Sequence, residues 1–267
     1  MRFGRSFTLW LSLATPGVLA GQTSDTGGAP QTPGGAVETA PAYERPVCIR
    51  QLPENFLSDQ KRIWTFPAKL AKGHDWLPAA AILGTTAGLL ALDPIEGAYF
   101  HRSTAFSDFN HIFTSNATLY GAIATPVSMF VIGRARHDGK LEKTALLAGE
   151  AIADSAVVST AFKDITRRVR PENVPLHGNY YDTWFESGGS PISGTGGFPS
   201  GHTIVAFSAA TVIAHQYRNH RWVPYAAYGL AALVGFSRLS LSAHFFSDVF
   251  AGAAFGYSIS RFAVLRQ

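Results

Sequence analysis

The chain has 267 residues, of which 46% are hydrophobic and only 15% are charged, and its formal net charge is +4. This length allows one or two domains with a sizeable core. No run of Lys and Arg with interleaved aromatic residues occurs, which argues against a nucleic-acid-binding protein, and the modest basic excess does not by itself identify an anionic partner.

Residues 1–20 have the features of an export signal. Two arginines precede an apolar stretch, and Val18-Leu19-Ala20 fits a small-residue cleavage site. An uncleaved membrane anchor is the alternative. Residues 21–45 are rich in Gly, Pro, Thr and Ala and lack periodicity, so we predict a flexible linker. The folded domain is therefore expected over residues 46–267.

The remainder of the chain has helical rather than strand periodicity, which predicts an all-α fold. Apolar and charged positions in residues 52–66 follow an amphipathic helical spacing. Further apolar runs cover residues 76–92, 117–133, 143–168, 202–217, 222–237 and 244–263. Residues 171–199 are rich in Gly, Pro, Tyr and Ser, which indicates a long loop, and such a loop in a compact domain is usually functional or disordered.

The apolar runs are close to the length that spans a membrane. However, the mean hydropathy is only +0.08, and Glu150 and Asp154 lie inside one run, where a membrane would make carboxylates costly. The basic residues between the runs also imply a topology that conflicts with a cleaved export signal. We therefore expect a soluble or peripheral periplasmic domain. The alternative is an integral inner-membrane protein with its active site facing the periplasm.

The first chemically informative stretch is "KDITRRVRP", residues 163–171. Lys163 and Arg170 are seven residues apart, so on a continuous helix they would lie about 20° apart and reach one anion. Pro171 would end that helix. The alternative is a solvated basic helix end that the helix dipole favours.

The second stretch is "GGFPSGHTIVAFSAA", residues 196–210. Pro, Ser200 and Gly201 precede an apolar run in the order that starts a helix. The first turn of a helix has free N–H groups and a partial positive charge, which suit an anion. The alternative is that Ser200 only caps the helix and that His202 is incidental.

The third stretch is "SRLSLSAHFFSDVFAG", residues 237–252. His244 and Asp248 have the i, i+4 spacing that places them on one helical face. A carboxylate there can accept from one ring nitrogen and leave the other free to attack. Arg238 adds a fork of donors that suits phosphate. The alternative is a buried His–Asp pair that holds helices together.

Together these stretches read K-x6-R-P, P-S-G-H and S-R-x5-H-x3-D, and over residues 163–248 the chain resembles the type 2 phosphatidic acid phosphatase (PAP2) and vanadium haloperoxidase superfamily. The resemblance implies an all-α helical bundle with the active site at one end. It implies that the phosphoryl oxygens are bound by Lys163, Arg170, Ser200, Gly201 and Arg238. It also implies that His244 attacks phosphorus, that Asp248 orients this histidine, and that His202 protonates the leaving alkoxide and then activates water.

The expected function is hydrolysis of phosphate monoesters or lipid phosphates through a phosphohistidine, with no metal or other cofactor. One alternative is a vanadate-dependent haloperoxidase in which His244 binds vanadate, although the chain is short for that group. Another is a non-catalytic membrane-associated helical protein, against which the complete signature argues. Candidates for shaping substrate entry lie in the long loop; they are His177, Tyr180, Tyr181 and Trp184.

Overall fold

The computed structural model describes residues 47–189 and 192–265. The predicted export signal and linker lie outside the described residues. In this part of the chain the secondary structure is helical and includes no strand, which confirms the all-α prediction. The α-helices are α1 (Leu52–Trp64), α2 (Phe66–Ala71), α3 (Trp76–Leu90), α4 (Asp93–Arg102), α5 (Ser107–Ile112), α6 (Ser115–Arg136), α7 (Gly139–Thr166), α8 (Gly201–Gln216), α9 (Trp222–Ser240) and α10 (Phe246–Ser258).

Six of these helices correspond to the apolar runs read from the sequence, and their ends have local causes. The side chain of Asp138 accepts a hydrogen bond from the Leu141 N–H at 3.0 Å and so caps the start of α7. The same helix stops at Thr166 because Arg167 adopts a left-handed conformation with φ of 43°. The short helices α2, α4 and α5 were not predicted.

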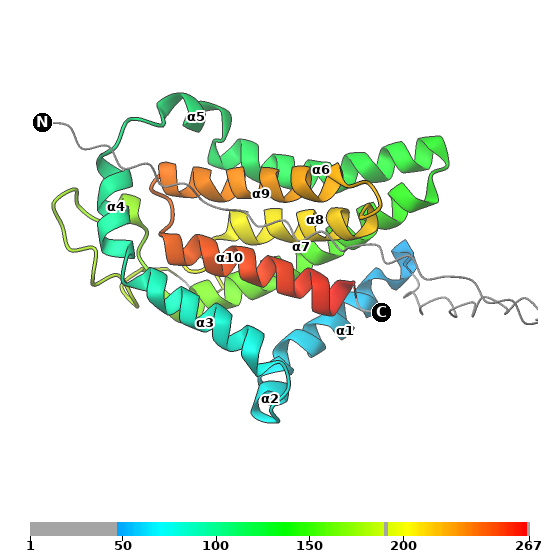
Figure 1. Ribbon diagram of the computed structural model, residues 1–267, viewed down its shortest axis with the longest axis horizontal. Coiled ribbons are helices and arrows are strands. Elements are labelled where there is room, and N and C mark those ends of the chain that lie inside the picture. The colour runs from blue at the N-terminus through cyan, green and yellow to red at the C-terminus, as the bar shows by residue number, and fades with distance from the viewer. Residues whose placement is uncertain (1–46, 190–191, 266–267) are drawn as a thin grey trace, which may run out of the picture. The chain divides into compact units, whose positions relative to one another are not determined.

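Helix α8 lies among α7, α9 and α10, and Figure 1 shows these helices side by side. Its contact with α10 is close because Gly252 and Gly256 lie one turn apart on the same face of α10. A Cβ atom on Gly252 would lie 2.8 Å from the carbonyl oxygen of Ser200, and one on Gly256 would lie 2.4 Å from that of Ile204. Both helices therefore run in the same direction and begin at the same end of the bundle.

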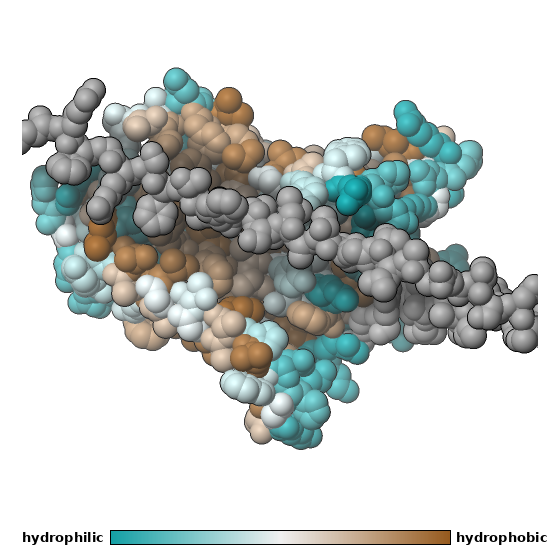
Figure 2. Space-filling model, in the orientation of Figure 1, coloured by the Kyte–Doolittle hydropathy of each residue, from teal (hydrophilic) through white to brown (hydrophobic). Residues whose placement is uncertain are grey.

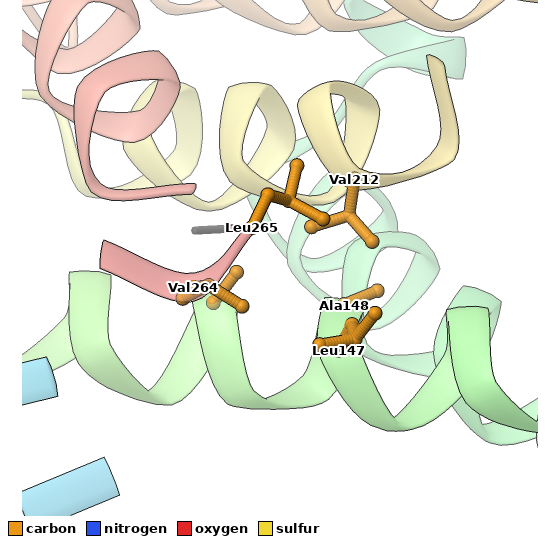
Figure 3. Close-up of a cluster of buried hydrophobic side chains, with 6 residues drawn as sticks. Leu147, Ala148, Val212, Val264 and Leu265 are labelled. Atoms are coloured by element: carbon orange, nitrogen blue, oxygen red, sulfur yellow. The ribbon is translucent and has the colours of Figure 1, made fainter. Parts of the chain in front are cut away.

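A hydrophobic cluster packs the bundle toward the opposite end of α8. It joins Leu147 and Ala148 of α7 to Val212 of α8 and to Val264 and Leu265 near the C-terminus, as Figure 3 shows. These side chains are at most 5% exposed. Burial of apolar area at about 25 cal/mol per Å² makes such a cluster a main source of stability, so the polar residues at the other end need not hold the fold alone.

Two helical segments of the described residues are long and apolar enough to cross a membrane, namely Ser115–Arg136 and Gly139–Asn173. The bent pair α3 and α4 would provide a third. Only 17% of the apolar window of α6 is buried, and Val127 and Val131 are more than half exposed. Figure 2 shows hydrophobic surface over the middle of the helical unit, with hydrophilic residues gathered near α2 and the turn between α6 and α7. A helix at the surface of a water-soluble protein normally exposes polar residues. Helix α6 instead exposes apolar residues such as Val127 and Val131.

Candidate active site

The structure brings the eight predicted site residues to one end of the bundle, where α9 and α10 are joined by a short connection beside α4 (Figure 1). Backbone hydrogen bonds and one close side-chain approach link the motifs to one another. The Ser200 N–H donates to the Asp248 carbonyl at 3.0 Å, and the His244 N–H donates to the Arg238 carbonyl at 3.2 Å. Lys163 Nζ lies 3.1 Å from the point where a Cβ of Gly201 would be. The three sequence motifs therefore form one site.

The part of this site that the motifs predict to bind phosphate is built on the first turn of α8. Ser200 occupies the N-cap position, but its side chain makes no capping hydrogen bond to the helix. Its Oγ instead accepts from Thr203 Oγ1 at 2.9 Å. The first-turn N–H groups are thus not satisfied by their own cap residue, which is the arrangement that suits an anion. Gly201 allows Lys163 to approach this turn, because any side chain there would meet the ammonium group.

Lys163 and Arg170 reach the site differently from the prediction. They do not share a helical face, because α7 ends at Thr166 and Arg170 lies in extended backbone with φ of −82° and ψ of 152°. Pro171 begins a short 3-10 helix (Pro171–Asn173) and does not end α7. The charge of Arg170 still acts on Lys163. The loop after α7 therefore brings Arg170 near Lys163.

Arg238 is fully buried in the last turn of α9 and is held by the segment that begins α6. Its Nη1 donates to Ser115 Oγ at 2.9 Å, and its Nη2 donates to the Phe113 carbonyl at 2.7 Å. The Nε2 atom of His202 lies 3.0 Å from the Ser115 carbonyl oxygen. One residue, Ser115, therefore fixes both Arg238 and His202. No motif in the sequence pointed to it.

His244 and Asp248 are adjacent, but not as two residues on one helical face. His244 precedes α10, whose first residue is Phe246, and Asp248 is the third residue of that helix. The His244 Nδ1 atom lies 3.6 Å from Asp248 Oδ2, which is a charge contact longer than a hydrogen bond. The same Oδ2 accepts from the Phe245 N–H at 2.9 Å. Asp248 thus caps α10 while it faces the histidine.

Both histidines are neutral at pH 7. Burial lowers the pKa of His244 to about 4, and Lys163 and Arg170 lower it further, while Asp248 acts in the opposite direction. Burial also lowers the pKa of His202 to about 4, with the charge of Arg238 as the next cause. A neutral imidazole has a free lone pair, so His244 is in the form that a nucleophile requires.

Sequence reasoning missed Arg168 and Asp93. Arg168 is 2% exposed, and its guanidinium donates to Asp248 Oδ1 at 2.6 Å and to Asp93 Oδ2 at 2.7 Å. Arg168 belongs to the motif "KDITRRVRP", but nothing in that string distinguishes it from its neighbour Arg167. Asp93 begins α4, in a region where the sequence offered no signature.

The long loop packs on the site through two of its predicted aromatic residues. Tyr180 is buried, and its hydroxyl lies 2.8 Å from His101 Nδ1. The Trp184 ring stacks on Arg168, with the guanidinium carbon 4.6 Å from the ring centroid. Tyr181 is 76% exposed. These contacts attach the loop to the bundle, and a role in substrate entry stays a prediction.

The buried carboxylates of α7 belong to another part of the bundle. Asp154 Oδ1 accepts a hydrogen bond from Gln60 Nε2 of α1 at 2.8 Å. Asp154 lies nine residues before Lys163, or about 13 Å along the helix, which separates it from the candidate site. Within residues 47–189 and 192–265, no group of three or more His, Cys, Asp or Glu side chains could hold a metal ion.

A family model of the PAP2 superfamily matches residues 144–267, and the match includes all three motifs of the site. Over residues 144–267 the chain is therefore similar to the PAP2 superfamily. This confirms the resemblance inferred from the motifs. Residues 47–143, which supply Asp93 and Ser115, lie outside the matched PAP2 region.

Two curated relatives come from Porphyromonas gingivalis. A lipid A 4'-phosphatase is 29% identical over 138 residues, which cover 52% of this chain and 51% of the relative. A lipid A 1-phosphatase is 42% identical over 60 residues, which cover 22% of this chain and 14% of the relative. The chain thus spans about half the length of one relative and a smaller part of the other.

Among solved structures, the chain is similar to the crystal structure of a transmembrane PAP2-type phosphatidylglycerolphosphate phosphatase from Bacillus subtilis. The two are 20% identical, and the alignment covers 80% of this chain and 92% of the other with a TM-score of 0.39.

Proposed function

We propose that this protein is a membrane-associated phosphatase that hydrolyses lipid phosphate monoesters through a phosphohistidine, without a metal ion. One observation carries the proposal. A buried, neutral His244 lies within the charge field of Lys163 and Arg170, and its N–H donates to the Arg238 carbonyl. Lys163 in turn approaches the uncapped first turn of α8 at Gly201. Phosphoryl transfer needs little from a protein beyond such positioning and charge stabilisation.

In the first step, His244 attacks phosphorus. Asp248 faces Nδ1, so Nε2 is the ring nitrogen that forms the new N–P bond. The bond from phosphorus to the alcohol oxygen breaks, and its electron pair goes to that oxygen. His202 donates a proton to the departing alkoxide, and the three cations with the α8 N–H groups stabilise the charge on the other oxygens.

In the second step, a water molecule attacks the phosphohistidine. His202, now neutral, takes a proton from this water, the N–P bond breaks, and inorganic phosphate leaves. His202 must be protonated for the first step, although its pKa in the free protein is about 4. A bound phosphate dianion offsets the nearby positive charge and raises that pKa, so substrate binding itself favours the acid form.

The proposal of a lipid substrate rests on the outer surface of the bundle. The apolar faces of α3 and α6 are exposed, with Leu83 67% and Val131 59% accessible. Burying such faces in a bilayer removes apolar area from water. This favours the integral membrane alternative over the soluble or peripheral domain expected from the sequence. The names of the two Porphyromonas relatives also support a lipid phosphate as the substrate.

The test is phosphate release by the purified full-length protein in detergent, on a panel of soluble and lipid phosphates. His244→Ala should lower turnover by about 10³-fold or more, since it removes the nucleophile. His74→Ala is the matched control, because His74 is exposed and lies outside the three motifs of the site. Wild-type turnover by the His244 variant would overturn the mechanism. Vanadate-dependent bromide oxidation without phosphate release would replace the function with that of a haloperoxidase.

A further inference from the structure

We infer that Arg168, held in place by Asp93, is a positioning residue that sets the orientation of the Asp248 carboxylate toward His244. The inference deepens the proposed function and rests on it. Asp248 has two carboxylate oxygens with different partners. Oδ2 faces His244 Nδ1 at 3.6 Å, and Oδ1 receives Arg168 Nη1 at 2.6 Å. Because both oxygens belong to one planar carboxylate, the contact of Oδ1 with Arg168 also sets the direction of Oδ2 toward His244.

Arg168 is itself held on all sides. Its guanidinium lies between two rings, 4.2 Å from the Phe245 centroid and 4.6 Å from the Trp184 centroid. Its Nη2 donates to Asp93 Oδ2 at 2.7 Å, and its Nε lies 3.3 Å from Thr183 Oγ1. A guanidinium group that contacts two aromatic rings and two carboxylates has little freedom to rotate.

Helix α4 also binds the first residues of α10, through hydrogen bonds from backbone N–H groups to Asp93 and Glu96. The Ser247 N–H donates to Asp93 Oδ1 at 3.1 Å, and the Phe246 N–H donates to Glu96 Oε1 at 2.7 Å. Arg168 Nη1 also donates to Ser247 Oγ at 2.7 Å. The residues that follow His244 are therefore anchored to two carboxylates of α4.

This network is placed to affect catalysis as well as folding. The two carboxylate oxygens of Asp248 face Arg168 and His244, so a change in the Arg168 side chain should act on the nucleophile and not on substrate binding. A lysine keeps the charge but has a single ammonium on a flexible stem, which cannot pair with Asp93 and Asp248 in the planar geometry of a guanidinium. Misplacement of a reacting group by about 1 Å can cost about 100-fold in rate.

The first experiment compares Arg168→Lys with Arg167→Lys. Arg167 is the exposed neighbour, whose Nε donates to the Ser187 carbonyl at 2.9 Å. We expect Arg168→Lys to lower kcat by about 10- to 100-fold with KM changed less than about threefold, and Arg167→Lys to leave both unchanged. A rise in KM at constant kcat would overturn the inference, because it would place Arg168 in substrate binding.

A double-mutant cycle separates positioning from a general structural role. In an Asp248→Asn background, Arg168→Lys should lower the residual kcat less than about twofold, since the carboxylate that it orients is gone. An equal loss in both backgrounds would show that Arg168 acts without Asp248 and would overturn the inference. If Arg168→Lys does not fold, Asp93→Asn decides: this isosteric change should lower kcat by about 3- to 10-fold at constant KM, and unchanged kcat would overturn it.

A second readout does not depend on turnover. Histidine NMR titration of the full chain in detergent should give a lower pKa for His244 in Arg168→Lys than in the wild type, because an Asp248 carboxylate that is no longer directed at Nδ1 raises that pKa less. Lys163 and Arg170, which lower that pKa, are unchanged in both proteins. An unchanged pKa would overturn the inference. Absence of phosphate release by the wild type would instead reject the proposed function, and the titration would still decide on Arg168.

Discussion

Replacing Gly252 with alanine tests how α10 is held against α8. The new Cβ would lie 2.8 Å from the Ser200 carbonyl oxygen and 3.2 Å from Thr203 Cβ. An ordinary contact begins at 3.4 Å, so the carbonyl and the new methyl group must separate by at least 0.6 Å. The Ser200 carbonyl accepts a hydrogen bond from the Ile204 N–H at 3.0 Å and cannot rotate away without losing it, so α10 itself must move.

The size of the effect follows from two opposing terms. Overpacking a well-packed contact costs about 1–3 kcal/mol, and alanine is favoured over glycine within a helix by about 0.5–1 kcal/mol. The net loss of unfolding free energy should be about 1–2 kcal/mol. For a domain of this size that is a drop of roughly 2–8 °C in Tm. Turnover should also fall by about tenfold, because Ser200 and Asp248 move apart.

The assay is thermal unfolding of purified protein in detergent, followed by circular dichroism, together with kcat on the best phosphate substrate. Gly229→Ala is the matched control, because a Cβ at Gly229 of α9 would meet no atom within 4 Å. That variant should be as stable as the wild type or slightly more stable. If Gly252→Ala has the Tm and kcat of the Gly229 control, the close packing of α10 on α8 does not hold the site.

Three further outcomes are expected. Activity should survive EDTA, and orthovanadate should inhibit competitively as a mimic of the pentacoordinate phosphorus; loss on chelation that Mg²⁺ restores would contradict the metal-free scheme. The acid limb of the pH profile of kcat/KM should lie near pH 4, because burial lowers the pKa of His244 to about 4 and the imidazole is neutral above that pH. A limb near pH 6.5 would show that burial does not lower this pKa. The full chain should stay with the membrane in a high-salt wash and come off in detergent; release by salt would favour the soluble or peripheral domain and soluble phosphate esters.

The helices and the catalytic signature could be predicted from the sequence because both depend on local patterns. Apolar runs of about 16 to 26 residues correspond to α3 and α6 through α10, with ends that differ by a few residues. Where the prediction was wrong, the error lay in assuming that a helix continued. The left-handed Arg167 ends α7 before Arg170, and α10 begins only after His244.

The sequence alone could assign His244, Ser200 and Arg238 to one candidate site, since each lies in a short motif of the PAP2 signature. Their partners could not be predicted. Asp93 reaches Arg168 across 75 positions and Ser115 reaches Arg238 across 123, and no local pattern marks either residue. Such contacts exist only once α4 and α6 pack at the end of the bundle, because tertiary packing brings distant polar groups together and burial then requires each to be paired.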